Sequence, residues 1–565
     1  MDFKYEISKA ISNAAGIDEN EILKAIEIPP NSDMGDYAFP CFKLAKTFRK
    51  APPAIAAEIC GKIEKPPFVS EIKIIGAYIN FFTDKSFFAK EVITKVLAEG
   101  TEYGRSEKGR GKTIVIDYSS PNIAKPFHVG HLRSTVIGNA IYKIHEFLGY
   151  NCVGINHLGD WGTQFGKLIY AYKHWGSEKD VEEKGIEELM RIYVKYHDEA
   201  EKNPAMDDEA RGWFVKMQEG DEEALTLWKW FYDISIKEFE RVYDMLGVKF
   251  DAYTGESFYN DKMAPVVQEL KDKGLLKESE GALIVDLDEF SMPPCLIIRK
   301  DGGTLYATRD ITAAIYRKKT YNFDKCIYLT ALDQNLHFAQ WFKVIEKMGY
   351  EWSGDLAHVP FGLVSLESGT LSTRRGNVVL MEELLNKSIE ETLKIIEEKN
   401  PDLPDKENVA KKVGIGAVIF NDLYNGRIKD VVFSWERMLS FEGETGPYVQ
   451  YTNARACSVI KKAGICEISG EIDFSKVSDE SSAEVCKLLD IFPSKVVDSA
   501  AKYEPSVISR YLVDLAQAFN KFYHDNVILT DDEETRKARL AVVMAVSNVL
   551  KTGLGLLGIG APEQM

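Results

Sequence analysis

The chain of 565 residues is too long for one hydrophobic core, because such cores rarely exceed about 250–300 residues, so several domains are expected. Its content of 45% hydrophobic and 28% charged residues is that of an ordinary soluble protein. A net charge of −17 argues against a broad nucleic-acid-binding surface, although a local basic face can coexist with an acidic remainder.

Features that would direct the chain to a membrane or out of the cell are weak. The first residues, MDFKYEISKAISNAAG, contain no apolar run of the kind found in signal peptides. The most apolar stretch, residues 540–561, is interrupted by polar residues and glycines and is not expected to span a bilayer. The eight cysteines are scattered without a CxxC pair, as is typical of reduced thiols. A cytoplasmic protein is expected.

Residues 1–105 predict a small α/β domain. Its apolar spacing indicates three helices around two short strands. These elements cover residues 5–15, 38–49 and 53–65 for the helices and 69–75 and 78–82 for the strands. The polar, glycine-rich segment 101–112 then predicts a linker.

From Thr113 onward, alternating strand and helix patterns predict a parallel doubly wound sheet. A charged helical segment over about 175–250 divides this pattern and predicts an insertion. Strand patterns return after the insertion, and we expect them to complete the same sheet. They cover residues 282–287, 295–300, 326–331 and 358–364.

Almost everything after residue 386 has helical spacing. Residues 508–524, for example, place apolar side chains on one helix face. The last part of the chain, from about residue 435, therefore predicts a helix bundle.

The stretch 117–139, DYSSPNIAKPFHVGHLRSTVIGN, carries the clearest chemical signal. A predicted strand leads into a polar loop that ends in His128-Val129-Gly130-His131 at a predicted helix start. A helix N-terminus offers free N–H groups and partial positive charge, and Gly130 lets a flat ring approach bare backbone. The imidazoles and the Lys125 ammonium can stabilise charge that builds on phosphate. The stretch predicts an ATP site with attack on the α-phosphate.

The same HxxH spacing could also bind zinc. No Cys, Glu or third His stands at a supporting spacing and HExxH is absent, so no zinc or other metal site is predicted. Two-metal chemistry based on carboxylates stays open.

Two further motifs have an ordinary alternative. Residues 156–166, NHLGDWGTQFG, follow a predicted strand, where doubly wound folds bind ligands, but could equally form a tight turn around a core tryptophan. Residues 371–379, LSTRRGNVV, could clamp phosphates with hydroxyl and guanidinium groups, although a basic surface turn is the commoner origin of such a run.

Residues 301–310, DGGTLYATRD, suggest a cage for a guanidinium group. Tyr306 and Asp310 lie four apart and share a face if the segment is helical, and Glu256 is another candidate acid. Two carboxylates and a ring suit the planar fork of arginine. Taken alone, Asp310 would more commonly pair with a neighbouring arginine of this chain.

In this order, the motifs resemble those of arginyl-tRNA synthetases, a family of class I aminoacyl-tRNA synthetases. HVGH corresponds to the first class I signature and residues 371–375, LSTRR, to a degenerate second one. The similarity runs from near residue 30 to the end. Its other supporting stretches are SSPNIAKPFHVGHLRST, NHLGDWGTQFG, LYATRD, IYLTALDQNLHFAQ, WERMLSFEGETGPYVQYTNAR and GLGLLGIGAPEQM.

The resemblance implies a multidomain α/β architecture. Residues 1–105 would be an N-terminal tRNA-binding domain on the D-loop side, and 106–385 a Rossmann-like catalytic domain with the helical insertion at about 175–250. Residues 386–434 would form a helical connector, and 435–565 an all-α anticodon-binding domain.

The resemblance also implies roles for individual residues. The catalytic set would be Lys125, His128 and His131. ATP would contact Gly130, Asp333, His337, Ser372, Arg374 and Arg375. Arginine would contact Asn122, His157, Asp160, Glu256, Tyr306, Asp310 and Gln334. tRNA would contact Tyr78 and Asn80, because a ring and an amide suit an unpaired base, although both could instead be structural.

One departure from the class pattern concerns lysine. The second signature of many class I enzymes carries two lysines, whereas residues 370–374 here contain none. In arginyl enzymes a lysine just before the first signature often serves instead, and Lys125 occupies that place. It is expected to meet pyrophosphate charge, with less weight on Arg374 and Arg375.

The implied reaction joins L-arginine to tRNA(Arg) through arginyl-adenylate, with ATP and Mg²⁺, and the family resemblance implies a monomer. Three alternatives stay open: a class I synthetase for another amino acid, a small-molecule nucleotidyltransferase, and a non-catalytic tRNA-binding paralogue. The two terminal domains would be unexplained in a small-molecule enzyme. Intact Lys125, His128 and His131 argue against a non-catalytic paralogue.

Overall fold

The computed structural model describes residues 3–29, 31–300, 302–303, 306–366, 379–465, 467–468 and 470–565. Packing divides the chain into two compact units. The first contains Met1–Tyr103, Arg455–Phe492 and Asp514–Val549. The second contains Gly104–Ala454, Pro493–Val513 and Leu550–Met565, and it holds most of the predicted site residues.

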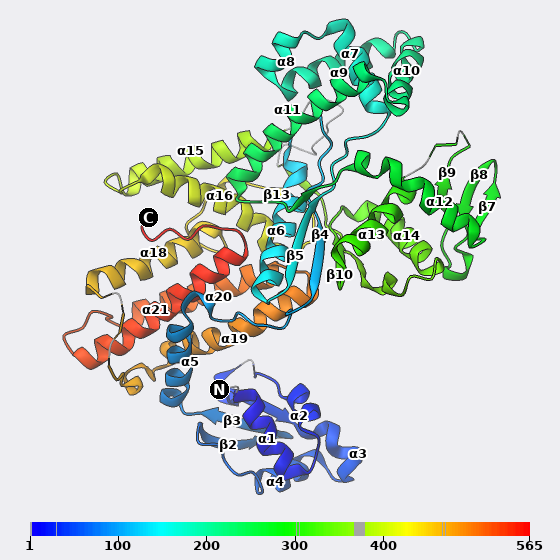
Figure 1. The fold of residues 1–565 in the computed structure, drawn as a ribbon. Coiled ribbons are helices and arrows are strands. Elements are labelled where there is room, and N and C mark those ends of the chain that lie inside the picture. Colours follow the sequence, from blue (N-terminus) through cyan, green and yellow to red (C-terminus); the bar gives the residue numbers. More distant parts are fainter. Residues whose placement is uncertain are drawn as a thin grey trace. The chain divides into compact units, whose positions relative to one another are not determined.

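A five-stranded parallel sheet lies at the centre of the second unit (Figure 1). Its order is β11-β10-β4-β5-β6, and all neighbouring strands are parallel. The direction of winding reverses between β4 and β10, where doubly wound sheets bind ligands at the carboxyl ends of their strands. The predicted Rossmann-like sheet is confirmed. The strands are β4 (Thr113–Asp117), β5 (Asn151–Asn156), β6 (Ala252–Tyr253), β10 (Lys325–Tyr328) and β11 (Leu356–His358).

Helices pack against the sheet and bury its apolar strands. Trp341 is fully buried, and it shares one core cluster with Val115 of β4, Ile155 of β5 and Ile311. Strands buried on both faces need near-continuous apolar runs, which explains the sequence TIVID in β4. The helices of this part are α6 (Leu132–Phe147), α7 (Thr163–Trp175), α12 (Met263–Asp272), α13 (Tyr306–Tyr321) and α14 (Asn335–Lys347).

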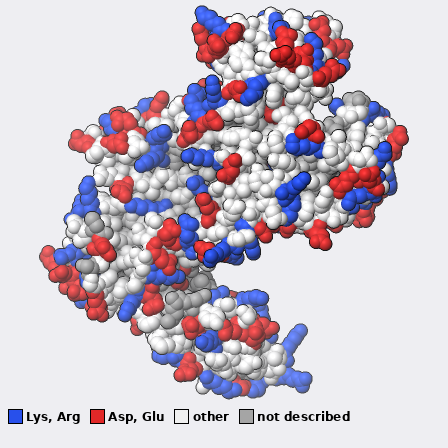
Figure 2. Space-filling view, viewed as in Figure 1, with Lys and Arg blue, Asp and Glu red and all other residues white. Residues whose placement is uncertain are grey.

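The predicted helical insertion is present. Its longest helix, α11, begins where the Asp221 side chain accepts a hydrogen bond from Ala224 N and ends at Gly247, whose φ is +66°. On the face shown in Figure 2, acidic and basic side chains are interspersed over these helices, so neither charge dominates there. The helices are α8 (Glu178–Lys184), α9 (Ile186–Ala200), α10 (Ala205–Glu219) and α11 (Glu222–Leu246).

The assignment of residues 282–287 and 295–300 to the parallel sheet is wrong. β7 (Leu276–Ser279), β8 (Ala282–Val285) and β9 (Cys295–Ile298) form a separate antiparallel sheet. Glu280 and Gly281 both have positive φ and join β7 to β8 as a two-residue hairpin. Parallel neighbours need a far longer crossover, so this connection excludes them. The run 358–364 is also divided, between β11 and β12 (Val364–Leu366).

The N-terminal segment contains the predicted strand pair, with one correction. The expected helix over 38–49 begins instead as a strand, β1 (Tyr37–Pro40), which pairs antiparallel with β3. All four of its residues are buried, so this run lacks the polar face of a surface helix. The other elements are α1 (Phe3–Ala15), α2 (Glu19–Ala25), α3 (Ala45–Phe48), α4 (Pro52–Cys60), α5 (Lys85–Glu99), β2 (Val69–Ile75) and β3 (Tyr78–Thr83).

The last third of the chain is helical, as predicted, apart from β13 (Val431–Phe433), which pairs in parallel with β12. Among the described residues, one helix, α21, is long and apolar enough to cross a membrane, and 72% of its apolar window is buried inside the protein. The helices are α15 (Met381–Lys399), α16 (Lys406–Tyr424), α17 (Trp435–Met438), α18 (Gly446–Ala463), α19 (Glu480–Lys502), α20 (Ser506–Asp525) and α21 (Glu533–Leu556).

Candidate active site

The HVGH motif forms a tight turn at the start of α6, beyond the carboxyl end of β4. The two imidazole rings lie 4.0 Å apart between centroids. A Cβ at Gly130 would lie 2.7 Å from the His128 ring, so the flat group that this glycine admits against its backbone is that imidazole. The short spacing of the motif therefore brings both histidines to one place.

Backbone hydrogen bonds determine the tautomers of both histidines. Gly130 N–H donates to His128 Nδ1 at 3.0 Å, and His128 N–H donates to His131 Nδ1 at 3.2 Å. Each Nδ1 must accept, so in the neutral rings the proton sits on Nε2. Burial, with Lys125 nearby, lowers the pKa of His128, and burial beside His128 lowers that of His131 to about 3. The turn thus holds two neutral imidazoles, each with an Nε2–H donor.

Loops after β4 and β5 meet beside this turn. Asn122 and Gly159 form a parallel bridge, and Ile123 N–H donates to Gly159 O at 3.2 Å. A Cβ at Gly159 would lie 1.8 Å from Asn122 Oδ1, so this glycine is required for the close approach. Asn122 is exposed and Lys125 is half-buried. The structure therefore brings these two predicted residues to the same edge of the sheet as HVGH.

Glu256 lies beside Arg309, with 3.5 Å between carboxylate and guanidinium. Both side chains are largely buried. Burial raises the pKa of Glu256 to about 7, and the neighbouring Arg309 opposes that rise. The first carboxylate of the predicted cage therefore already has a cationic partner from this chain.

Asp310 has a partner of its own. Its Oδ2 accepts a hydrogen bond from His337 Nε2 at 2.5 Å. His337 was assigned to ATP by resemblance, but here it contacts a carboxylate assigned to arginine. Tyr306 begins α13 on the same helix as Asp310 and is 65% exposed. The predicted helical spacing of the two is confirmed.

Asp160 is buried behind the site rather than open to it. Its carboxylate accepts hydrogen bonds from Ser257 N at 2.7 Å and Ser257 Oγ at 2.6 Å, and it is 2% exposed. Burial raises its pKa, while these two bonds oppose the rise. Because Ser257 follows Glu256 directly, Asp160 orients that residue. The predicted contact of Asp160 with arginine stays a prediction.

The other predicted site residues that follow β5 and β10 differ in their exposure. His157 Nδ1 donates to Thr254 O at 2.8 Å, so a neutral ring has an unprotonated Nε2 that can accept a hydrogen bond. Asp333 and Gln334 are exposed in a short 3₁₀ helix, Leu332–Gln334, directly before α14. These two side chains lie beyond the carboxyl end of β10, next to β4 in the sheet.

Ser372, Arg374 and Arg375 lie outside the described residues. The described positions on either side of them are anchored. Val129 N–H donates to Val379 O at 3.1 Å, and His128 forms an antiparallel bridge with Leu380. On the other side, β12 ends at Leu366 against β13.

The two residues proposed for tRNA differ in exposure. Tyr78 is half-buried and contacts Phe42 edge to face. Asn80 is 2% exposed, so its amide is not presented at the surface. Of the two side chains, that of Tyr78 is the more exposed.

Sequence reasoning missed Arg309 as the partner of Glu256, and Ser257 as the residue that donates hydrogen bonds to Asp160. Arg309 is adjacent to Asp310 in the chain, and this was the only available signal. Its contact with Glu256 spans more than fifty positions, so spacing could not reveal it. Ser257 carried no signal except its place beside Glu256.

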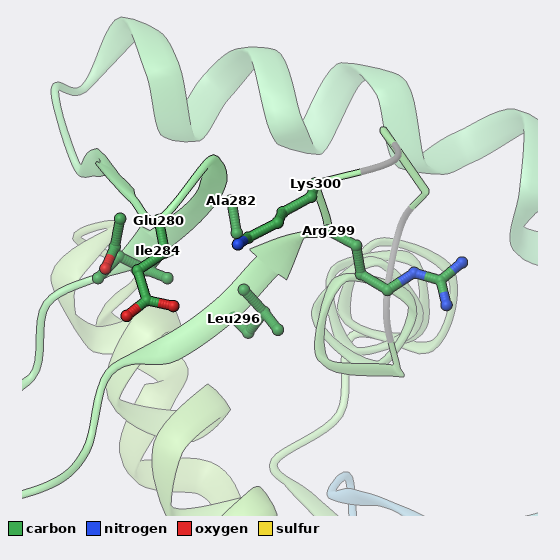
Figure 3. A pocket seen from close by; sticks show the side chains of 7 residues that line it. Glu280, Ala282, Ile284, Leu296, Arg299 and Lys300 are labelled. Atoms are coloured by element: carbon green, nitrogen blue, oxygen red, sulfur yellow. The ribbon is translucent and has the colours of Figure 1, made fainter.

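A separate hollow of about 500 Å³ lies on the antiparallel sheet. Figure 3 shows apolar side chains among those that line it, Ala282, Ile284 and Leu296, with the Lys300 side chain extending towards Ala282. Among the described residues that line it, none is a predicted site residue and Glu280 is the one acidic side chain. The hollow is therefore unsuited to a guanidinium and distinct from the site at HVGH.

Three family models match the chain. The model for the arginyl tRNA synthetase N terminal domain covers residues 1–83. The model for the catalytic domain of class I (R) tRNA synthetases covers 92–435, and that for the DALR anticodon binding domain covers 449–565.

Curated relatives match over full length. The arginine–tRNA ligase of Alkaliphilus metalliredigens (strain QYMF) is 59% identical over 565 residues, and that of Clostridioides difficile (strain 630) is 56% identical over 566 residues. Each comparison covers 100% of both chains.

Solved structures agree. The arginyl-tRNA synthetase of Thermus thermophilus superposes with a TM-score of 0.85 at 26% identity, covering 100% of both chains. That of Plasmodium falciparum superposes with a TM-score of 0.81 at 25% identity, covering 99% of this chain and 98% of the other.

Proposed function

The chain belongs to the arginyl-tRNA synthetase family, and we propose that it makes arginyl-adenylate from L-arginine and ATP and transfers the arginyl group to tRNA(Arg). The observation that carries this proposal is the HVGH turn at the carboxyl edge of a parallel sheet that also presents buried carboxylates. AMP and diphosphate are the other products. ATP enters as its Mg²⁺ complex.

On the nucleotide side, the proposed chemistry asks for charge stabilisation rather than a covalent nucleophile. An oxygen of the arginine carboxylate bonds to the α-phosphorus, and the bond from that phosphorus to the diphosphate oxygen breaks. The Nε2–H groups of His128 and His131 donate to phosphate oxygens as the negative charge grows. Lys125 supplies the positive charge that two neutral imidazoles lack. Gly130 keeps the turn tight.

On the amino acid side, Glu256 and Asp310 would receive the guanidinium and Tyr306 would lie against its plane. Asp160 acts through Ser257 by orienting Glu256. Asn122, His157 and Gln334 would contact the amino and carboxylate end. Asp333 and the residues of the second signature, Ser372, Arg374 and Arg375, would contact ATP.

The partners that the carboxylates already have in this chain determine which substrates can bind in the arginine half. Arg309 and His337 already contact the carboxylates, so the substrate must replace or join them. A ligand with a planar, bidentate, permanently charged group can do so, whereas lysine offers one compact ammonium and citrulline none. Arginine should be preferred without an editing step.

For tRNA, we propose that Tyr78 contacts an unpaired base on the D-loop side and that the helical C-terminal part reads the anticodon. The domains would be 1–105, 106–385, 386–434 and 435–565. We also propose a monomer. Because the net charge is −17, tRNA binding must depend on local basic patches and should weaken steeply with salt.

The test is ATP–pyrophosphate exchange with each of the amino acids, with and without tRNA(Arg). Exchange that depends on arginine is expected. Higher exchange with another amino acid would identify a different class I synthetase. No exchange with any amino acid, together with retained tRNA binding, would favour a non-catalytic paralogue.

A further inference from the structure

Arg133 and Asp422 form an ion pair inside the second unit. Arg133 lies on α6 two residues after HVGH, and Asp422 lies near the end of α16. Nε and Oδ1 are 2.9 Å apart, and the side chains are 1% and 2% exposed. Removing two charges from water costs more than their attraction commonly returns, so such a pair is weak as a device for stability alone.

Arg133 has a second contact, which extends the connection. Its Nη1 donates to Lys429 O at 2.5 Å. Lys429 belongs to the segment 423–431, which leads from the end of α16 into β13. The guanidinium therefore joins the HVGH helix to two points of the chain around this segment.

The segment 423–431 also contacts the chain that leads into β12. Gly362 N–H donates to Arg427 O at 2.9 Å, and Leu363 N–H donates to Asp430 Oδ1 at 2.7 Å. A Cβ at Gly362 would lie 2.8 Å from atoms of Lys429 and Asp430, so the two chains are in direct contact. β12 and β13 continue this pairing.

Contacts from the start of α20 reach the same segment. Arg427 N–H donates to Glu504 Oε1 at 3.2 Å, and Ser509 Oγ donates to Leu423 O at 2.7 Å. These contacts lie within the second unit, and α20 then continues to Asp525 in the part that matches the anticodon-binding model. One segment therefore touches α20, β12 and the HVGH helix.

We propose that Arg133 and Asp422 are positioning residues that couple the start of α20, through segment 423–431, to the HVGH turn. The inference rests on the proposed function, since it assigns a route by which the helical C-terminal part acts on ATP use. Arg133 supplies a polar side-chain link from α6 to segment 423–431 and to the end of α16 just before it.

The test uses arginine-dependent ATP–pyrophosphate exchange by the full chain with tRNA(Arg) present. Arg133→Lys keeps a charge for Asp422, but one ammonium cannot reproduce the fixed fork that also reaches Lys429 O. The exchange kcat should fall about tenfold, while the KM for arginine stays within about twofold. Glu504→Gln should lower kcat by a smaller factor.

The decisive experiment combines Arg133→Lys and Glu504→Gln in one chain. If one route carries both effects, Glu504→Gln should change kcat little once Arg133 is lysine. If the variant that carries both changes instead lowers kcat by the product of the two separate factors, the proposal is overturned. The double variant Arg133→Met with Asp422→Leu fills the site with apolar groups, so it should fold and still show the low kcat. A folded double variant with normal kcat would also overturn it.

A matched control is available in the helical insertion. Glu188 is 1% exposed and pairs with Arg191, so Glu188→Gln disturbs an equally buried carboxylate away from the segment and should leave kcat unchanged. Loss of kcat in this control as well would show that any buried charge matters, against the specific route. Absence of arginine-dependent exchange in the unmodified chain would instead contradict the proposed function.

Discussion

The nucleotide half and the arginine half of the site differ in how charge is held. HVGH is a local turn whose hydrogen bonds come from its own backbone, and burial keeps its imidazoles neutral. The arginine half is assembled from distant segments, and its carboxylates rest against Arg309 and His337. The nucleotide half therefore presents hydrogen-bond donors that are already in place, whereas in our proposal the arginine half would exchange internal partners of its carboxylates for the substrate guanidinium.

The largest expected effect comes from removing the positive charge of Lys125, on which the proposal relies most for the nucleotide half. Lys125→Ala should lower the exchange kcat roughly 100- to 1,000-fold, about 2.7–4 kcal/mol, since neutral imidazoles cannot replace an ammonium. Steady-state exchange measures it, with Lys108→Ala as the control for an exposed lysine. A kcat within a few-fold of the unmodified protein would contradict the role of Lys125.

The next effect concerns the arginine half. Asp310→Asn keeps an oxygen for His337 but removes the charge, so the KM for arginine should rise roughly 30-fold or more, about 2 kcal/mol at least. The KM for ATP should change little. Both KM values are measured for the same variant, so that the effects on the arginine half and on the nucleotide half can be compared. An equal rise in the two KM values would contradict the separation of the site into two halves.

A smaller effect should appear as a pH dependence. Burial raises the pKa of Glu256 to about 7, so this group becomes a neutral acid as the pH falls through that value. Since the guanidinium binds the carboxylate form, the KM for arginine should rise on acidification, by up to about tenfold per pH unit below 7. Glu256→Gln should raise KM and flatten the profile. If the KM for arginine of this variant still rises on acidification as steeply as in the unmodified protein, another group is responsible for the pH dependence.

The smallest effect tests indirect positioning. Ser257→Ala removes the hydroxyl bond to Asp160 and leaves the backbone bond. The KM for arginine should rise roughly two- to tenfold, about 0.5–1.5 kcal/mol, with kcat nearly constant. An effect as large as that of Asp310→Asn would mean that Asp160 acts on the substrate more directly than its burial indicates.

Sequence reasoning was most successful where structure is local. The HVGH turn, the shared helix of Tyr306 and Asp310, and the strands β2, β3 and β4 follow from short-range spacing. It failed where pairing partners are distant. The runs that form β8 and β9 were placed in the parallel sheet, although they belong to an antiparallel one, because apolar strand patterns do not encode a neighbour. Local spacing also could not decide whether Asn80 contacts tRNA or has a structural role, and in the structure its side chain is buried.

The sequence by itself determined which chemical groups are present and which of them share a turn or a helix, because three- or four-residue separations leave little freedom. It also determined the family, through the order of its motifs. The tertiary structure decided that Glu256 pairs with Arg309, that Asp310 accepts a hydrogen bond from His337 and that Asp160 accepts one from Ser257. These contacts depend on how the loops at the edge of a folded sheet converge, and that convergence depends on packing across the whole domain.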